Sequence, residues 1–153
     1  MLDKIDKDIL RELQVDAKQK TYQLSKKLNI PRTTIHNRIR KLEKDGVIKS
    51  YKAIVDPKKL DKKLTVLIGI VAGLESGSKE MASKLAKIPH VEEVYIISGQ
   101  FDILIKVRLR DTDELAKLIF SLEAGLRSLH GITKTESMIV LGTENEDGIT
   151  DIE

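Results

Sequence analysis

The chain has 153 residues, of which 41% are hydrophobic and 33% are charged, and it contains no cysteine. This balance is too apolar for a disordered polyelectrolyte and predicts a folded protein of one or two small domains. The absence of cysteine excludes disulfides, thiolate nucleophiles and iron–sulfur clusters. No apolar run reaches the ~18 residues of a membrane span, and residues 1–4 lack a signal-peptide pattern, so we expect a cytoplasmic protein.

Positive charge is concentrated in the first part of the chain. Residues 1–60 carry 16 lysines and arginines against 8 aspartates and glutamates, whereas residues 61–153 carry 11 against 16. Two segments of opposite net charge predict two modules, and the basic one is expected to face a polyanion such as nucleic acid.

The first module begins with two short amphipathic helices. Apolar residues at helical spacing from Ile5 to Leu13 predict a helix of about three turns. Thr21 is expected to cap a second helix that buries Leu24 and Leu28. A tight turn at residues 29–31 follows, because Asn tolerates a left-handed conformation and Pro31 suits the first position of a new helix.

The third predicted helix runs from Pro31 to Asp45, with Gly46 ending it and Ile35, Ile39 and Leu42 forming its buried stripe. A short helix, a tight turn and a basic helix together predict a helix-turn-helix module that binds double-stranded DNA. Arginine can bridge guanine, asparagine can pair with adenine, and lysine can reach phosphates. The alternative is a merely solvated helix face. The candidate DNA-binding residues on the outward face are Arg32, Thr33, Thr34, His36, Asn37, Arg40, Lys41 and Lys44.

A connector follows this module, which we assign to residues 1–50. Residues 47–55 alternate like a strand and end at Asp56-Pro57, so residues 51–63 are expected to form a strand-like linker. Its lysine-rich part, residues 57–63, is interpreted as solvated in preference to making additional phosphate contacts.

Residues 64–142 predict a second module with a βαββαβ order, which is the ferredoxin-like arrangement of four antiparallel strands with both helices on one face. The fold class is therefore α+β, a helix-turn-helix domain followed by a ferredoxin-like domain. Leu67 and Val71 would lie on the uncovered face, where a partner sheet predicts a homodimer. Residues 143–153 are expected to be a loose acidic tail. The predicted elements are strands 64–71, 91–97, 101–110 and 132–141, a helix from 78 stopped by Pro89, and a long helix from 111 to Leu129.

Three stretches of the sequence resemble the leucine-responsive regulatory protein and AsnC (Lrp/AsnC) family of prokaryotic transcription regulators. They are LDKIDKDIL at residues 2–10, IHNRIRKLEKDGVI at 35–48 and YKAIVDP at 51–57. Pro31 departs from the family, in which a Ser often caps the recognition helix. Twenty lysines with few Asn and Gln indicate a thermophilic source, and an archaeal member is expected.

The resemblance implies a C-terminal domain that assembles dimers into tetramers or octamers and binds a small effector, an amino acid. The family's Gly-x-aromatic-Asp signature matches Gly99, Gln100, Phe101 and Asp102, and Asp102 could hold an ammonium group. The segment around Lys134 also resembles the family, and the hydroxyls of Thr133 and Thr135 could complete the site. The alternative is a simple hairpin turn in which Asp102 caps local amides.

No catalytic, metal or nucleotide-binding pattern is apparent. His36, His90 and His130 show no metal-ligand spacing, and no phosphate-binding glycine loop is present. We therefore expect no enzyme activity, no metal and no cofactor. The leading hypothesis is a sequence-specific transcriptional regulator with a small-molecule effector. An architectural DNA-coating protein without effector is the alternative, and residues 1–55 argue against a third class, a regulatory subunit of an amino-acid enzyme.

Overall fold

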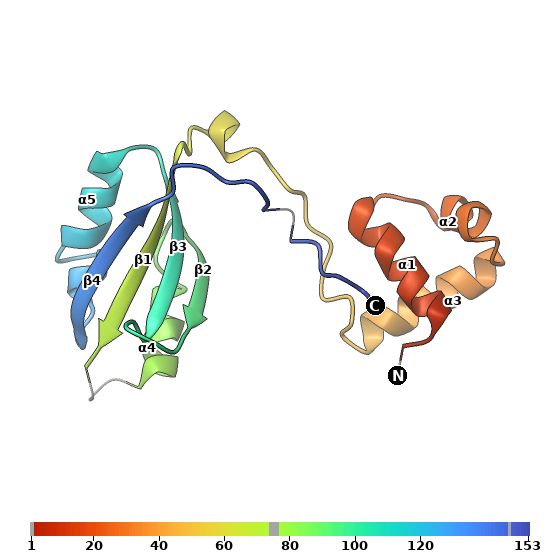
Figure 1. Cartoon of the computed structure of the whole chain (residues 1–153), viewed down its shortest axis with the longest axis horizontal. Helices are drawn as coiled ribbons and strands as arrows, with labels where there is room; N and C mark the ends of the chain where they lie inside the picture. Colours follow the sequence, from red (N-terminus) through yellow and green to blue (C-terminus); the bar gives the residue numbers. More distant parts are fainter. Residues whose placement is uncertain (1, 74–76, 147) are drawn as a thin grey trace. The chain divides into compact units, whose positions relative to one another are not determined.

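The computed structural model of the chain describes residues 2–73, 77–146 and 148–153. It divides into two compact units (Figure 1). The first unit comprises Met1–Ile54 together with Asn145–Glu153, and the second comprises Val55–Glu144. None of the helices in the described ranges is long and apolar enough to cross a membrane.

Three helices form the body of the first unit, as predicted: α1 (Lys4–Val15), α2 (Thr21–Leu28) and α3 (Arg32–Lys44). α1 begins at a capping box, in which the Asp6 amide donates to Asp3 Oδ1 at 2.9 Å and the Asp3 amide donates to Asp6 Oδ2 at 3.1 Å. The helices enclose one apolar core, made by Ile9, Leu10, Leu24, Ile35 and Leu42.

The turn between α2 and α3 is built as predicted, with Asn29 in the left-handed conformation at φ 54°. Two helix starts differ from prediction by one residue. Thr21 is the first residue of α2 and not its cap, since the preceding Lys20 amide is satisfied by Gln23 Oε1 at 2.7 Å. Pro31 is the N-cap of α3 and not its first helical residue, because its ψ of 139° is still extended.

The connector after α3 does not form the predicted strand. Gly46 ends α3 at φ 70°, and the next two amides both donate to the Leu42 carbonyl, at 2.9 and 3.0 Å. The rest of residues 47–55 is irregular, because no described strand lies alongside to complete a ladder. A short 3-10 helix, η1 (Pro57–Leu60), precedes the second unit's sheet.

The second unit has the predicted βαββαβ order. Its sheet is antiparallel with strand order β2-β3-β1-β4, so β1 and β3 lie in the centre. Both helices cover one face, where Met81 and Leu85 of α4 and Leu115 and Leu118 of α5 meet the inward residues of β1 and β3 (Figure 1). The elements are β1 (Leu64–Ala72), α4 (Ser78–Leu85), β2 (Val91–Ile96), β3 (Ile103–Leu109), α5 (Thr112–Phe120), η2 (Leu126–Ser128) and β4 (Ile132–Ile139).

The predicted long helix to Leu129 is wrong, because α5 ends at Phe120. Ser121 is extended, and the chain folds back through Gly125 into η2, which places Leu126 in the core with no exposed surface. A Cβ on Gly125 would lie 2.6 to 2.9 Å from backbone atoms at the end of α5. The apolar residues from Leu115 to Leu129 have the spacing of one helix, but in the structure they belong to a helix, a turn and a short 3-10 helix.

The other face of the sheet carries no described helix. Leu67 and Val71 of β1 lie on it half-buried, and Met138 of β4, opposite Leu67, is 37% exposed. Phe101 lies on this open face, with its ring over Gly69, and not on the buried face of the alternating residues that begin at Ile103. It precedes β3 in the hairpin, where strand alternation does not yet apply.

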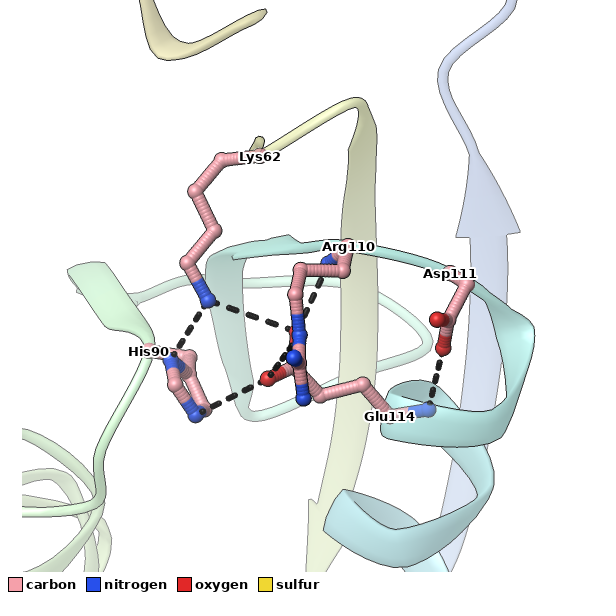
Figure 2. A network of polar contacts seen from close by, with 5 residues as sticks. All are labelled: Lys62, His90, Arg110, Asp111 and Glu114. Carbon is pink, nitrogen blue, oxygen red and sulfur yellow. Dashed lines mark hydrogen bonds and ion pairs between the residues drawn. The ribbon is translucent and has the colours of Figure 1, made fainter. Parts of the chain in front are cut away.

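A polar network around Glu114 ties the chain before β1 to α5 (Figure 2). Lys62 Nζ lies 3.3 Å from Glu114 Oε2 and 3.2 Å from His90 Nδ1, and His90 Nε2 lies 3.5 Å from Glu114 Oε1. The Arg110 amide donates to Glu114 Oε2 at 2.6 Å. This amide, followed by Lys62, lowers the pKa of Glu114. Lys62 is thus ion-paired, in contrast to the solvated linker lysine we expected.

Candidate DNA-binding helix and effector pocket

The outward face of α3 carries the eight predicted DNA-binding residues. Thr34 is half-buried, and the other seven are exposed, while Ile35 and Leu42 of the same helix are buried. Within the described part of the chain, none of the eight side chains has a hydrogen bond or ion pair. The exposed residues are Arg32, Thr33, His36, Asn37, Arg40, Lys41 and Lys44. α3 therefore presents a continuous set of unpartnered donors, which is what a DNA groove and its phosphates require.

Arg38 belongs to the same helix but has a different role. Its Nη1 lies 2.5 Å from Asp3 Oδ2 and 3.1 Å from Asp6 Oδ1, so it ties α3 to the start of α1. The Asp6 amide and then the Arg38 guanidinium lower the pKa of Asp3, and the two carboxylates raise the pKa of Arg38. Sequence reasoning gave Arg38 no role. Its place beside the half-buried Ile39 was the available signal.

The two ends of α3 differ in how they are held. No side chain caps its start, because Pro31 stands at the N-cap, and such an uncapped helix start suits a phosphate. Near its end, the Tyr51 hydroxyl donates to Glu43 Oε1 at 2.9 Å. Burial and this carboxylate raise the pKa of Tyr51 to about 12. Tyr51 was not predicted as a site residue, yet it fixes the connector to α3.

The Gly99–Asp102 loop closes the hairpin between β2 and β3. Gly99 has φ 132°, a conformation that favours glycine, and Gln100 is exposed. Asp102 Oδ2 accepts the amide of Ala72 in β1 at 2.8 Å. In the alternative without an effector, Asp102 was expected to accept a backbone amide near the hairpin. It does accept a backbone amide, but one from the neighbouring strand β1.

A pocket of about 330 Å³ contains the two predicted threonines. Thr133 Oγ1 donates to the Val71 carbonyl at 3.0 Å. Two cations, Arg127 and Lys134, share the pocket with apolar side chains. The lining residues are Ile119, Leu122, Leu126, Arg127, Leu129, Ile132, Thr133, Lys134 and Thr135. Sequence reasoning missed those before Ile132 because it placed them on one helix.

The predicted effector site has two parts, residues 99–102 and the segment around Lys134, and one pair of side chains brings them near each other. Lys134 Nζ lies 5.9 Å from the centre of the Phe101 ring, within cation–π range. Gly99, Gln100, Phe101 and Asp102 do not themselves line the pocket of Thr133 and Thr135.

A helix-turn-helix unit with an exposed reading helix, joined to a βαββαβ unit with a pocket, defines a DNA-binding protein with an attached sensor domain. Comparison with known proteins agrees. Residues 2–49 match the winged helix-turn-helix DNA-binding family model, and residues 65–149 match the Lrp/AsnC ligand binding domain. The chain belongs to the Lrp/AsnC family of transcriptional regulators, which confirms the predicted family, fold class and regulatory function.

Two kinds of relatives illustrate this membership. The HTH-type transcriptional regulator FL11 of Pyrococcus horikoshii is 40% identical over 147 residues, which cover 95% of this chain and 93% of FL11. The structure of AsnC from E. coli matches with a TM-score of 0.81 and 30% identity over 95% of this chain and 96% of that one. A feast or famine regulatory protein from M. tuberculosis, complexed with L-methionine, matches with a TM-score of 0.89 and 25% identity over the whole of both chains.

Proposed function

We propose that this regulator reads operator DNA by inserting α3 into the major groove. The observation that carries the proposal is the set of eight α3 side chains without a partner in the described chain. Thr33, Asn37 and Arg40 lie opposite the buried stripe, so they face base edges, while Lys41 and Lys44 near the helix end reach phosphates. The protein acts in this way as a regulator and not as an enzyme, in the cytoplasm where genomic DNA lies.

The reading helices work in pairs. The open sheet face, with Leu67, Val71 and Met138, exposes apolar surface that a second copy of the same face would bury. A two-fold pair of chains presents two copies of α3 to two half-sites of one operator. Dimers assemble further into tetramers or octamers.

The effector we propose is an amino acid, the class of ligand carried by the M. tuberculosis relative. Arg127 supplies charge for its carboxylate, and the hydroxyls of Thr133 and Thr135 supply polar contacts beside apolar walls. The Asp102 carboxylate, which the sequence offered for the ammonium group, accepts the Ala72 amide and does not line this pocket, so Asp102 is not part of the site proposed here.

Selection of genomic fragments bound by the full chain, with and without a pool of the twenty amino acids, tests both the operator reading and the amino-acid effector. We expect a few fragments to exceed bulk DNA at raised salt, and the pool to change their enrichment. Absence of any preferred fragment would refute sequence-specific regulation and favour the architectural alternative. Preferred fragments whose enrichment is the same with and without the pool would refute the amino-acid effector.

Thermal shift with single amino acids then identifies the effector, because a ligand of the folded state raises the melting temperature. Thr133→Val should reduce the shift, since it removes the hydroxyl that lies in the pocket. Ser83→Ala is the control, because Ser83 Oγ bonds only within α4. Equal loss of the shift in both variants would argue against the pocket.

A further inference from the structure

The last residues of the chain lie on α1, inside the first unit, and not loose as expected from the acidic sequence. The Gln14 carboxamide bonds both backbone groups of one tail residue. Its Nε2 donates to the Thr150 carbonyl at 2.9 Å, and its Oε1 accepts the Thr150 amide at 2.7 Å. Such a two-way pair fixes both the position and the direction of an extended segment.

A second contact follows two residues later in the tail and one turn earlier in α1. Arg11 Nε and Nη2 both donate to the Ile152 carbonyl, at 3.1 and 2.6 Å. The Ile152 side chain is half-buried against the apolar core of the first unit. The tail therefore runs antiparallel to α1, with backbone bonds at alternate residues and one apolar anchor.

We propose that residues 149–153 form a strap that docks in the same chain on a peptide-binding surface of α1. The surface is defined by Arg11, Gln14 and the apolar core beneath Ile152. Its four hydrogen bonds all go to backbone atoms, so it recognises an extended peptide through its backbone and through one apolar side chain.

Docking gives the first unit a second tether. The chain passes between the two units once after Ile54 and again after Glu144. A unit held at two points has less orientational freedom than one on a single flexible linker. The second tether also continues directly from β4, which carries Thr133 and Thr135. If an effector binds in the proposed pocket, the chain that follows β4 links that pocket to α1, and this step rests on the proposed effector site.

Carboxypeptidase trimming of the full chain tests the docking. In the wild type, release of Ile152 should be slow, because the strap must open before cleavage. We expect the Arg11→Ala/Gln14→Ala double variant to release it roughly five to thirty times faster, and Lys4→Ala, also on α1, to match the wild type. Equal rates in the wild type and the double variant would overturn the proposal. Circular dichroism of each variant verifies that α1 is still folded.

Spin labels distinguish docking in one chain from docking on a partner. The chain has no cysteine, so Glu153→Cys with Val15→Cys introduces one defined pair. Diluted with unlabelled chains, the pair should give a single narrow distance that broadens when Gln14→Ala is added. A distance that disappears on dilution would mean that the strap docks on another chain, and a broad distribution in the parent would mean that it does not dock.

A chain ending at Glu144 tests the route to α1. It should still enrich the same fragments, but the amino-acid pool should change their enrichment less than in the full chain. A full response in the shortened chain would refute the route while leaving the docking measurements intact. Absence of any response in the full chain would instead count against the effector proposal.

Discussion

The two neighbouring arginines of α3 allow a sharp test of the DNA interface. Arg40 is exposed without a partner, whereas Arg38 is paired with Asp3 and Asp6 of α1. Losing one bidentate arginine–base contact weakens binding by about 1–3 kcal/mol. Because a two-fold operator contains two half-sites, Arg40→Ala should weaken dimer binding by about 2–6 kcal/mol, or roughly 1.5 to 4 powers of ten. Its melting temperature should equal that of the wild type.

Arg38→Ala should instead lower the melting temperature, because α3 loses its ion pairs to Asp3 and Asp6 of α1. The assay is titration of labelled operator and of a scrambled duplex at one salt concentration, with thermal unfolding of the same preparations. Arg40→Ala should lose affinity for the operator more than for the scrambled duplex. Equal losses on both duplexes would assign Arg40 to phosphates. An unchanged affinity would refute the placement of this face in the groove.

Three further outcomes follow from the contacts described. Lys44→Ala should reduce the salt slope of dimer binding to DNA by about 2, one for each half-site, while Lys27→Ala, which removes an ion pair to α1, should not. Equal slopes would reject Lys44 as a phosphate contact. Gly125→Ala should lower the free energy of unfolding, measured by urea denaturation, by roughly 1–3 kcal/mol, because the new Cβ would meet backbone atoms. A Cβ at Gly142 would meet nothing within 4 Å, so Gly142→Ala should leave the stability unchanged. The pKa of Glu114 is lowered, so its stabilisation is present above the unfolded pKa near 4.5 and is lost as pH falls through the folded value. Glu114→Gln should therefore flatten the acid limb of stability in urea titrations at several pH values, and an unchanged limb would contradict this.

The parts of the fold that sequence predicts are those fixed by local periodicity. The α2–α3 turn follows from Asn29 and Pro31, and the strand character and inward face of β3 follow from its alternation. The outward face of α3 follows from the helical wheel once Ile35 and Leu42 are known to be buried. Each of these depends on residues within a few positions of one another, so no knowledge of the rest of the chain is needed.

The elements that sequence missed depend on contacts between distant residues. Nothing local shows that α5 must stop, since the apolar residues up to Leu129 keep a helical spacing across the turn at Gly125. The predicted strand at residues 47–55 has the right alternation, but a strand also needs a neighbour. The strap on α1 joins residues more than a hundred positions apart, and its bonds go to backbone, which leaves no pattern in the side chains.

The position of the charges supports the proposal that α3 is the DNA-facing helix, even though basic residues occur throughout the first unit. Lys27 is paired with Glu12, Arg38 with Asp3 and Asp6, and Arg11 with Asp8. These pairs neutralise cations on α1, on α2 and on the inner side of α3. The cations of α3 that have no partner in the described chain are Arg32, Arg40, Lys41 and Lys44, all exposed on one helix. α3 thus carries four such cations, against Lys4 and Lys7 on α1 and Lys26 on α2. A concentration of unpaired positive charge on one helix attracts a polyanion, which supports the proposed placement of α3 on DNA.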